Sequence, residues 1–515
     1  MDIFSIFEQS ALRYRGMRAC EDDNRSVSFE QMYDRVIRIS TWLLRVGVSK
    51  GDRVCLLLNN CIYWAELDFA IARVGAVRAR LNVRDGFVEH KHIISELQPK
   101  VVVCNDVFAD YAASLPGNHL LAVAEKSYSS QTLLSLEAEI AKIEEIYSID
   151  AISPDSIYCI MHTSGTSGNY KGAFYTHRKW INATIRNTLV EPLADLGRGD
   201  VFAHVAPVTH MSGCLILPTL IRGGINRFFE KFDPSALLQA IDTGGVTHSI
   251  LAPTMLTRVC QEAASGKYDL SQLKTLLYAA SPIGSNALDE ALSLFGAKLY
   301  QGYGLTESLF FVSRLDKSDH LTERARGNKS CGLPFPWLDV KIDTEQGTDN
   351  ETDTVGELCV RGDNLCDGYW PEIDKGLTDD EGWFHTGDVA RIDENGYLYI
   401  VDRKNDMIIS GGFNVYPKEV EDIIRKMDGV EDCGVVGAPD DAWGERVCAF
   451  VVTNKGSMTE SSVVEFCQNS GLGRYKKPSM VKFVDDLPRN SGGKLLRREL
   501  KRLIPESVNS SVTEG

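Results

Sequence analysis

The chain has 515 residues, of which 43% are hydrophobic and 24% charged, and it carries a formal net charge of −16. This length exceeds what one hydrophobic core covers, so we expect a globular protein of two or more domains. The acidic balance argues against nucleic acid as a partner, because proteins that bind the phosphate backbone present basic surfaces.

The N-terminal segment and the cysteines indicate the compartment. Residues 1–8 contain no basic stretch and no long apolar run, so we expect neither a signal peptide nor a transmembrane helix. The 13 cysteines lie in apolar segments without a CxxC pair. This usage predicts reduced, mostly buried thiols in a cytoplasmic protein rather than disulfides or a metal cluster.

Helical and strand patterns alternate through the first part of the chain. Residues 29–46 have amphipathic helical spacing, residues 54–58 are typical of a buried strand, and residues 63–74 predict the next helix. The alternation recurs at residues 246–251 and 276–279, which are strand candidates that each precede a helical pattern. Such alternation predicts an α/β fold in which parallel sheets are covered by helices.

A Gly-rich loop follows a predicted buried strand at residues 157–161. Residues 162–172 read HTSGTSGNYKG and combine glycines, hydroxyls and one lysine. Glycines let backbone N–H groups turn toward an anion, and the hydroxyls and Lys171 add donors and positive charge. The loop is not a Walker A motif, because Tyr170 stands where that motif has glycine. By itself the segment fits a polyphosphate site and a surface loop equally well.

The pattern changes after Gly332. Residues 340–343, 356–360 and 396–401 are short strand candidates, and the acidic and polar segment 344–354 predicts an exposed turn. These features predict a small β-rich subdomain.

Beyond Asp402 the pattern is that of a compact α+β unit. Pro417 occupies a favourable first helical position, and residues 433–436 and 447–452 are strand candidates. We place a boundary at residues 403–406. The predicted units are an N-terminal domain (1–403), a C-terminal domain (404–506) and a disordered polar tail (507–515).

Four further segments follow the Gly-rich loop in order. They are residues 303–307 (YGLTE), 383–388 (WFHTGD), 402–404 (DRK) and 488–494 (PRNSGGK). With residues 162–172, this ordered set resembles the adenylate-forming superfamily: acyl-CoA synthetases, adenylation domains of peptide synthetases and luciferases. The resemblance extends from about residue 27 to about residue 500, and five motifs in one order make it specific.

The resemblance implies a MgATP site. The family's motif residues correspond here to Thr306 at the α-phosphate, Glu307 as the Mg²⁺ ligand, Asp388 at the ribose, and Arg403 as a second ribose or phosphate contact. The other residues expected to contact the nucleotide are Thr163, Ser164, Gly165, Thr166, Ser167, Gly168, Lys171, Gly302 and Tyr303.

Each of these assignments has a structural alternative. Thr306 and Glu307 could begin a helix, with Thr as the cap and Glu as a first-turn acid. Asp388 could belong to a surface turn, and Arg403 could form a surface ion pair of little energetic consequence.

Lys494 corresponds to the family's catalytic lysine, which bridges the substrate carboxylate and the α-phosphate. A cation between two anions offsets their repulsion and stabilises charge in the transition state. The alternative is a basic solvated tail, because four more basic residues follow within eight positions. The spacing from Pro488 favours the catalytic role.

The acyl pocket is assigned from the same resemblance. His210 matches an aromatic position that lines the pocket and gates the path of the thiol, and we interpret it as lining rather than as a general base. Gly213, Tyr278 and Ala280 complete the expected pocket at strand ends, where parallel α/β sheets bind ligands. The sequence slightly favours a small or medium acid.

Two C-terminal segments are candidates for contacts with CoA. Gly411 and Gly412 resemble the loop that approaches the pantetheine arm, where glycines permit close passage of the backbone. Residues 474–478 (RYKKP) could meet the CoA phosphates, or could be an exposed basic turn.

The sequence departs from the family pattern at several positions. These are Ser167 for Thr, Tyr170 for Pro, Asn405 where Lys or Asp marks the domain hinge, and Ala279 and Ser281 in the pocket segment. None of them removes a charged catalytic group, so we expect activity. Asn tolerates unusual backbone angles, so Asn405 is still predicted to be the pivot.

The resemblance implies an ATP-dependent carboxylate–CoA ligase with a mobile C-terminal domain. Its partners are a small-molecule carboxylic acid, ATP, Mg²⁺ and CoA. Two alternatives remain open: an adenylating enzyme that loads a carrier protein, and a catalytically quiet nucleotide-binding scaffold. The sequence names neither the acid nor the oligomeric state, for which a homodimer is one candidate.

Overall fold

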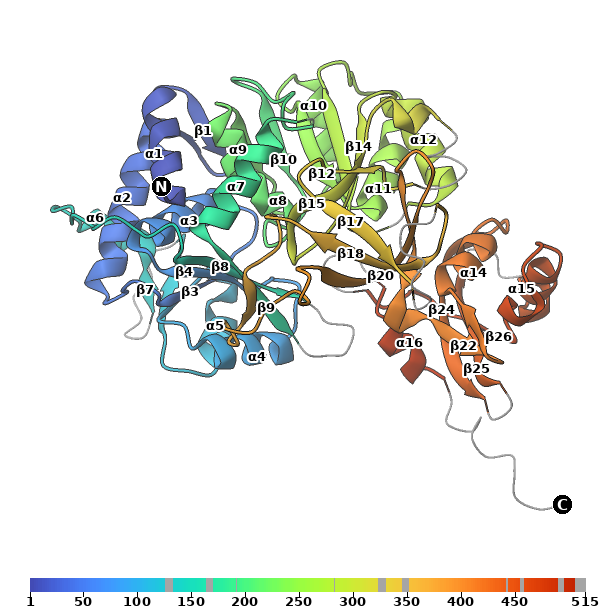
Figure 1. Ribbon diagram of the computed structural model, residues 1–515. Coiled ribbons are helices and arrows are strands. Elements are labelled where there is room, and N and C mark those ends of the chain that lie inside the picture. The colour runs from blue at the N-terminus through green and yellow to red at the C-terminus, as the bar shows by residue number, and fades with distance from the viewer. Residues whose placement is uncertain are drawn as a thin grey trace.

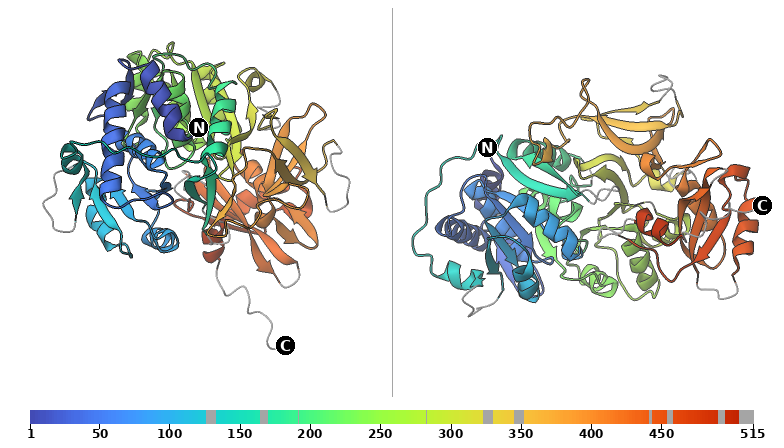
Figure 2. Two further views of the ribbon diagram at one scale, coloured as in Figure 1. Left: turned by 60° about the vertical axis from the view of Figure 1, so that its left-hand side comes forward. Right: turned by 90° about the horizontal axis from the view of Figure 1, so that it is seen from below.

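The computed structural model describes residues 1–125, 133–163, 170–190, 192–281, 283–322, 330–344, 352–440, 443–453, 458–489 and 495–504. They form a large domain with three sheets and a smaller C-terminal domain built around a fourth (Figure 1). Both views of Figure 2 show the C-terminal domain, in orange to red, at one side of the large domain. Among the described helices, none has the length and apolar character needed to cross a bilayer.

An eight-stranded sheet forms the first half of the large domain. In spatial order its strands are β19 (Gly368–Trp370), β9 (Lys171–Thr176), β8 (Ile157–Thr163), β4 (Val77–Arg80), β3 (Arg53–Leu57), β5 (Val101–Cys104), β6 (Leu120–Val123) and β7 (Leu134–Ser135). The strands from β8 to β7 run parallel, while β9 and β19 add an antiparallel edge. The predicted parallel sheet is confirmed.

A nine-stranded sheet forms the second half. In spatial order its strands are β16 (Leu333–Pro334), β15 (Ser308–Leu315), β14 (Leu299–Leu305), β13 (Thr275–Ala279), β12 (His248–Leu251), β10 (Val201–His204), β11 (Ile225–Phe228), β1 (Arg18–Glu21) and β2 (Ser26–Ser28). The centre, from β14 to β1, is parallel, and both ends are antiparallel.

Helices cover and separate the two sheets. In the large domain they are α1 (Ile3–Arg13), α2 (Phe29–Arg45), α3 (Ile62–Val74), α4 (Phe87–Leu97), α5 (Ala109–Ser114), α6 (Leu136–Ala141), α7 (His177–Thr188), α8 (Met211–Cys214), α9 (Ile216–Ile221), α10 (Pro234–Asp242), α11 (Pro253–Ala263) and α12 (Ser285–Phe295). Helix α2 starts where predicted because Ser28 and Gln31 form a reciprocal capping box. Trp64 on α3 and Trp180 on α7 belong to the largest apolar core.

A four-stranded antiparallel sheet confirms the predicted β-rich subdomain. Its strands are β17 (Asp339–Asp343), β18 (Gly356–Arg361), β20 (Phe384–Ile392) and β21 (Leu398–Arg403). Strand β21 ends at Arg403, and a short 3₁₀ turn, Lys404–Asp406, leads into the C-terminal domain.

The C-terminal domain has the predicted α+β composition. Its strands are β22 (Ile408–Ser410), β23 (Phe413–Val415), β24 (Val430–Asp440), β25 (Gly444–Thr453) and β26 (Met480–Phe483), and its helices are α14 (Pro417–Ile424), α15 (Glu460–Gln468) and α16 (Arg497–Arg502). Pro417 is the first residue of α14, as predicted. Lys418 ties α14 to the large domain, because its backbone N–H donates to Asp402 Oδ2 (2.8 Å) and its Nζ donates to the Ile400 carbonyl (2.6 Å).

All 13 cysteines are buried and free of disulfides. Burial raises the pKa of the Cys214 thiol to about 11, and it also raises the pKa of the Cys159 and Cys61 thiols. The predicted burial of the thiols is confirmed.

Candidate active site

Three tyrosine hydroxyls tie the three sheets of the large domain together at one place. Tyr175 on β9 donates to the Thr306 carbonyl (2.7 Å), and Tyr369 on β19 donates to Glu307 Oε1 (2.9 Å). Tyr303 on β14 donates to Asp388 Oδ2 on β20. The predicted nucleotide residues Tyr303, Thr306, Glu307 and Asp388 therefore lie together, although they come from two sheets.

Thr306 and Glu307 form the turn of the β14–β15 hairpin, in which Leu305 pairs with Ser308. The alternative in which they begin a helix is wrong. The hairpin also explains two glycines: a Cβ on Gly302 would lie 2.3 Å from the Phe311 ring, and a Cβ on Gly304 would lie 2.5 Å from the Phe310 carbonyl. Gly302 therefore serves the close packing of the two strands.

Asp388 lies within β20, directly opposite Arg403 on β21. It is 2% exposed, and Arg403 Nε lies 2.6 Å from its Oδ1. Burial opposes the charge on Arg403, but Asp388 outweighs this effect and raises the pKa of Arg403. Burial and the same carboxylate raise the pKa of Tyr303 far above its usual range, so its hydroxyl stays a donor. The alternative of a surface-turn aspartate is wrong, because this Asp is a buried acceptor.

Strand β8 ends at Thr163, which pairs with Lys171 at the start of β9. Residues 164–169, which include the predicted phosphate contacts Ser164, Gly165, Thr166, Ser167 and Gly168, lie outside the described residues. Lys171 Nζ lies 4.9 Å from the centroid of the Tyr369 ring, whose hydroxyl binds Glu307. Lys171 is thus brought to the same place as the Thr306–Glu307 turn.

Tyr170 shows what replaces the family's proline. Its hydroxyl donates to Glu89 Oε1 on α4 (2.9 Å), and its ring lies 5.8 Å from that of His92. Burial and Glu89 raise the pKa of Tyr170, whereas Arg498 on α16 acts in the opposite direction. Tyr170 therefore fixes this end of the loop to α4, and α16 of the C-terminal domain lies close to it.

His210 precedes α8 and contacts a residue that sequence reasoning missed. Its Nε2 lies 2.8 Å from Nδ2 of Asn82, which is 5% exposed and lies two positions beyond the end of β4. Burial, together with the positive charges of Arg80 and Arg84, lowers the pKa of His210 to about 3. A neutral ring with so low a pKa is a poor general base, which supports the interpretation of His210 as a lining residue.

The other three predicted pocket residues differ in how closely they are packed and how far they are exposed to solvent. A Cβ on Gly213 would lie 2.0 Å from the Val208 carbonyl, so glycine lets α8 approach the preceding loop. The side chain of Tyr278 is fully buried, and its hydroxyl contacts Gln301 Oε1 (3.2 Å) and His320 Nε2 (3.0 Å). Ala280 is exposed and has φ +82°, a conformation that costs a non-glycine residue energy.

The C-terminal candidates lie on two turns. Gly411 and Gly412 connect β22 to β23 with φ +59° and +81°, both in the left-handed region that favours glycine. Residues Arg474–Lys476 form a 3₁₀ turn, in which Lys476 binds Glu419 (2.7 Å). Part of the predicted basic CoA contact is therefore neutralised within the domain.

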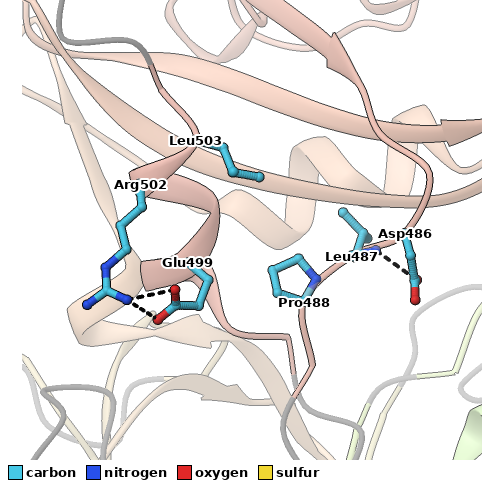
Figure 3. A pocket seen from close by; sticks show the side chains of 6 residues that line it. All are labelled: Asp486, Leu487, Pro488, Glu499, Arg502 and Leu503. Carbon is cyan, nitrogen blue, oxygen red and sulfur yellow. Dashed lines mark hydrogen bonds and ion pairs between the residues drawn. The ribbon is translucent and has the colours of Figure 1, made fainter.

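Lys494 lies outside the described residues. The residues that flank it, Arg489 and Leu495, form a β-bridge. Pro488 precedes this bridge and lines a shallow depression beside α16, where Arg502 binds Glu499 (Figure 3). The described residues thus place both ends of the lysine segment beside α16, the helix that lies near Tyr170.

The contacts of Tyr175, Tyr369 and Asn82 had no signal in the sequence. Their partners lie at least 62 residues away along the chain, so neither local spacing nor a motif could reveal them.

Comparison with known proteins gives consistent matches along the whole chain. The model of the AMP-binding enzyme family matches residues 7–370, and that of the AMP-binding enzyme C-terminal domain matches residues 419–494. A feruloyl-CoA synthase from Amycolatopsis sp is 34% identical over 481 residues, which is 93% of this chain and 94% of the relative. A 2-succinylbenzoate–CoA ligase from Bacillus cereus (strain ATCC 10987 / NRS 248) is 31% identical over 491 residues, covering 95% and 96%.

Solved structures agree. ATP-bound MatB from Rhodopseudomonas palustris is 27% identical with a TM-score of 0.85, over 99% of this chain and 100% of that one. MenE, the o-succinylbenzoate CoA synthetase of Bacillus subtilis, in complex with its acyl-adenylate intermediate, is 25% identical with a TM-score of 0.84, over 97% and 98%.

Proposed function

Because this chain belongs to the family of AMP-binding enzymes, we propose that its site activates a carboxylic acid with MgATP and transfers the acyl group to CoA. The substrate carboxylate attacks the α-phosphorus of ATP, which forms an acyl-adenylate and releases pyrophosphate. The thiolate of CoA then displaces AMP and forms the thioester. The observation that carries this proposal is the Tyr303–Asp388–Arg403 network beside the Thr306–Glu307 turn.

The adenylate makes the second step feasible. A free carboxylate is a poor electrophile, and its oxygen is a poor leaving group, whereas AMP leaves readily. Asp388 is a buried acceptor whose two oxygens are oriented by Tyr303 and Arg403, which suits two ribose hydroxyls. We assign ribose binding to Asp388 on this basis.

Glu307 fits a Mg²⁺ ligand. It offers carboxylate oxygens, the hard ligands that Mg²⁺ prefers, and Tyr369 holds Oε1 in place from a neighbouring strand. When bound, Mg²⁺ would neutralise charge on the phosphates of ATP. Lys171, exposed beside Tyr369, is assigned to the same phosphates.

We assign the bridging of carboxylate and α-phosphate to Lys494, and the approach of the CoA arm to Gly411 and Gly412. Because Lys494 and the Gly411–Gly412 turn belong to segments of the C-terminal domain about 80 residues apart in the sequence, we infer a separate orientation of that domain for each step. Asn405, exposed in the turn between the domains, is the proposed pivot, with domains at residues 1–403 and 404–506. A cytoplasmic location and a homodimer also stay predictions.

The test is pyrophosphate release from MgATP with a panel of carboxylic acids, followed by thioester analysis with free CoA. We expect acid-dependent release of pyrophosphate and a CoA thioester. Pyrophosphate without thioester would favour a carrier protein as the acceptor. No release with any acid would contradict the ligase function and favour a quiet scaffold.

A further inference from the structure

Strand β4 carries two buried arginines that differ in whether a carboxylate pairs with them. Arg78 and Arg80 are 4% and 6% exposed, and they point to the same face because side chains alternate along a strand. Arg78 is paired: its Nε lies 2.7 Å from Asp68 Oδ1, and the rings of Tyr158 and Trp180 pack against its guanidinium. The buried Arg78 charge is thus paired with a carboxylate within the protein.

Arg80 has no such partner. Within the part of the chain that the structure describes, its guanidinium forms neither a hydrogen bond nor an ion pair. Burial lowers the pKa of Arg80 to about 10, so the group still carries its charge at neutral pH. Burying an uncompensated cation is costly, and buried charges in proteins are normally paired. An anion that enters the site would remove this cost.

The position of Arg80 places it on the acyl side of the site. It is the last residue of β4, and Asn82, two positions later, contacts His210. The Arg80 side chain lies on the same face of β4 as Arg78, which packs against Trp180 of α7. The Arg80 charge also reaches α8, because it opposes the effect of burial on the Cys214 thiol pKa.

We propose that Arg80 binds a second anionic group of the acid substrate, so that the preferred substrates carry a carboxylate or similar acidic group besides the carboxyl that is adenylated. The planar guanidinium fork matches a carboxylate in a bidentate geometry. Arg84, exposed four positions beyond Arg80, adds positive charge near His210. His210 is neutral and adds no charge of its own, so the attraction for this anion comes from the arginines.

This inference rests on the proposed ligase function, and its test uses pairs of substrates. Pyrophosphate release is measured for dicarboxylic acids and for their monomethyl esters of the same length. The wild type should prefer the diacid. Arg80→Met should lower kcat/KM for the diacid by about 30-fold, the range expected for a lost charged hydrogen bond, while the monoester changes little. Arg80→Lys should restore part of the diacid rate.

Other outcomes overturn the inference. Equal losses for diacid and monoester would place Arg80 at the reacting carboxylate. A raised KM for ATP would place it at a phosphate, the other source of the same chemistry. A wild-type enzyme that prefers the monoester would show that the substrate carries no second anionic group bound by the site. If the wild type releases no pyrophosphate with any acid, the ligase function itself fails, a result distinct from a ligase that is indifferent to Arg80.

Stability gives a second readout, with Arg78 as the matched control. Arg80→Met should melt at the wild-type temperature or above it, because it removes an unpaired buried charge. Arg78→Met should melt lower, because it leaves Asp68 buried without its cation. Saturating diacid should raise the melting temperature of the wild type more than that of Arg80→Met. If Arg80→Met melts as low as Arg78→Met, Arg80 is a structural residue and the inference is wrong.

Discussion

The nucleotide side and the acyl side of the site treat charge differently. On the nucleotide side, Asp388 is bound by Tyr303 and Arg403, and Glu307 is bound by Tyr369. On the acyl side, Arg80 is buried without a partner among the described residues, and His210 is neutral. The first region is organised before any ligand binds, as suits a ligand that never varies. The second leaves one charge for the substrate to complement, so specificity resides there.

The largest expected effect is on adenylation. Lys494→Ala should slow acyl-adenylate formation about a hundredfold or more, since a lost transition-state cation costs about 3 kcal/mol. Thioester formation from supplied acyl-adenylate should be spared, because we assign Lys494 to the first step alone. Half-reaction assays for pyrophosphate and thioester measure both. Equal losses in the two assays would contradict two separate orientations of the C-terminal domain.

Asp388→Asn tests the organised nucleotide side. The amide removes a charged acceptor and leaves the partly buried Arg403 without its carboxylate. We expect the KM for ATP to rise about tenfold, corresponding to about 1.4 kcal/mol, with the KM for the acid unchanged. Steady-state kinetics with each substrate varied separately provide the measurement. An increase confined to the KM for the acid would contradict the assignment of Asp388 to the nucleotide side.

Glu307→Gln should have a smaller and recoverable effect. The amide keeps the shape and the contact with Tyr369 but loses the charge that a hard cation prefers. The rate should fall several-fold at low Mg²⁺ and recover in part as Mg²⁺ is raised. Activity titrated against Mg²⁺ checks this. Superimposable titrations for the variant and the wild type would show that Glu307 is not the ligand.

The smallest effect concerns stability and pH on the acyl side. The pKa of His210 is lowered to about 3 in the folded protein, below an unfolded value of about 6.5. Between these values the unfolded chain binds more protons, so His210 makes stability fall as pH drops below 6.5. The free energy of unfolding, measured with urea from pH 6.5 to 4.5, should therefore change less steeply with pH in His210→Gln, by about 1 kcal/mol per pH unit. Identical slopes would mean that His210 is not desolvated.

Local patterns along the chain predicted much of the architecture. The spacing of apolar residues placed α2, β3 and α3 within a few positions of their observed ends, because periodicity reports which face of an element is buried. Pro417 marked the start of α14 for a similarly local reason. The ordered motifs identified Thr306, Glu307, Asp388 and Arg403 as one site.

The sequence by itself thus determined the fold class, the family and the residue types of the proposed nucleotide site, because these depend on local spacing and on motifs. Only the tertiary structure decided how those residues are used. Thr306 and Glu307 occupy a hairpin turn rather than a helix start because β15 pairs with β14. Asp388 is a buried acceptor because the register of β20 and β21 sets it opposite Arg403. Arg78 and Arg80 look alike in sequence, and only packing, which brings Asp68 to one of them, makes the other available to a ligand.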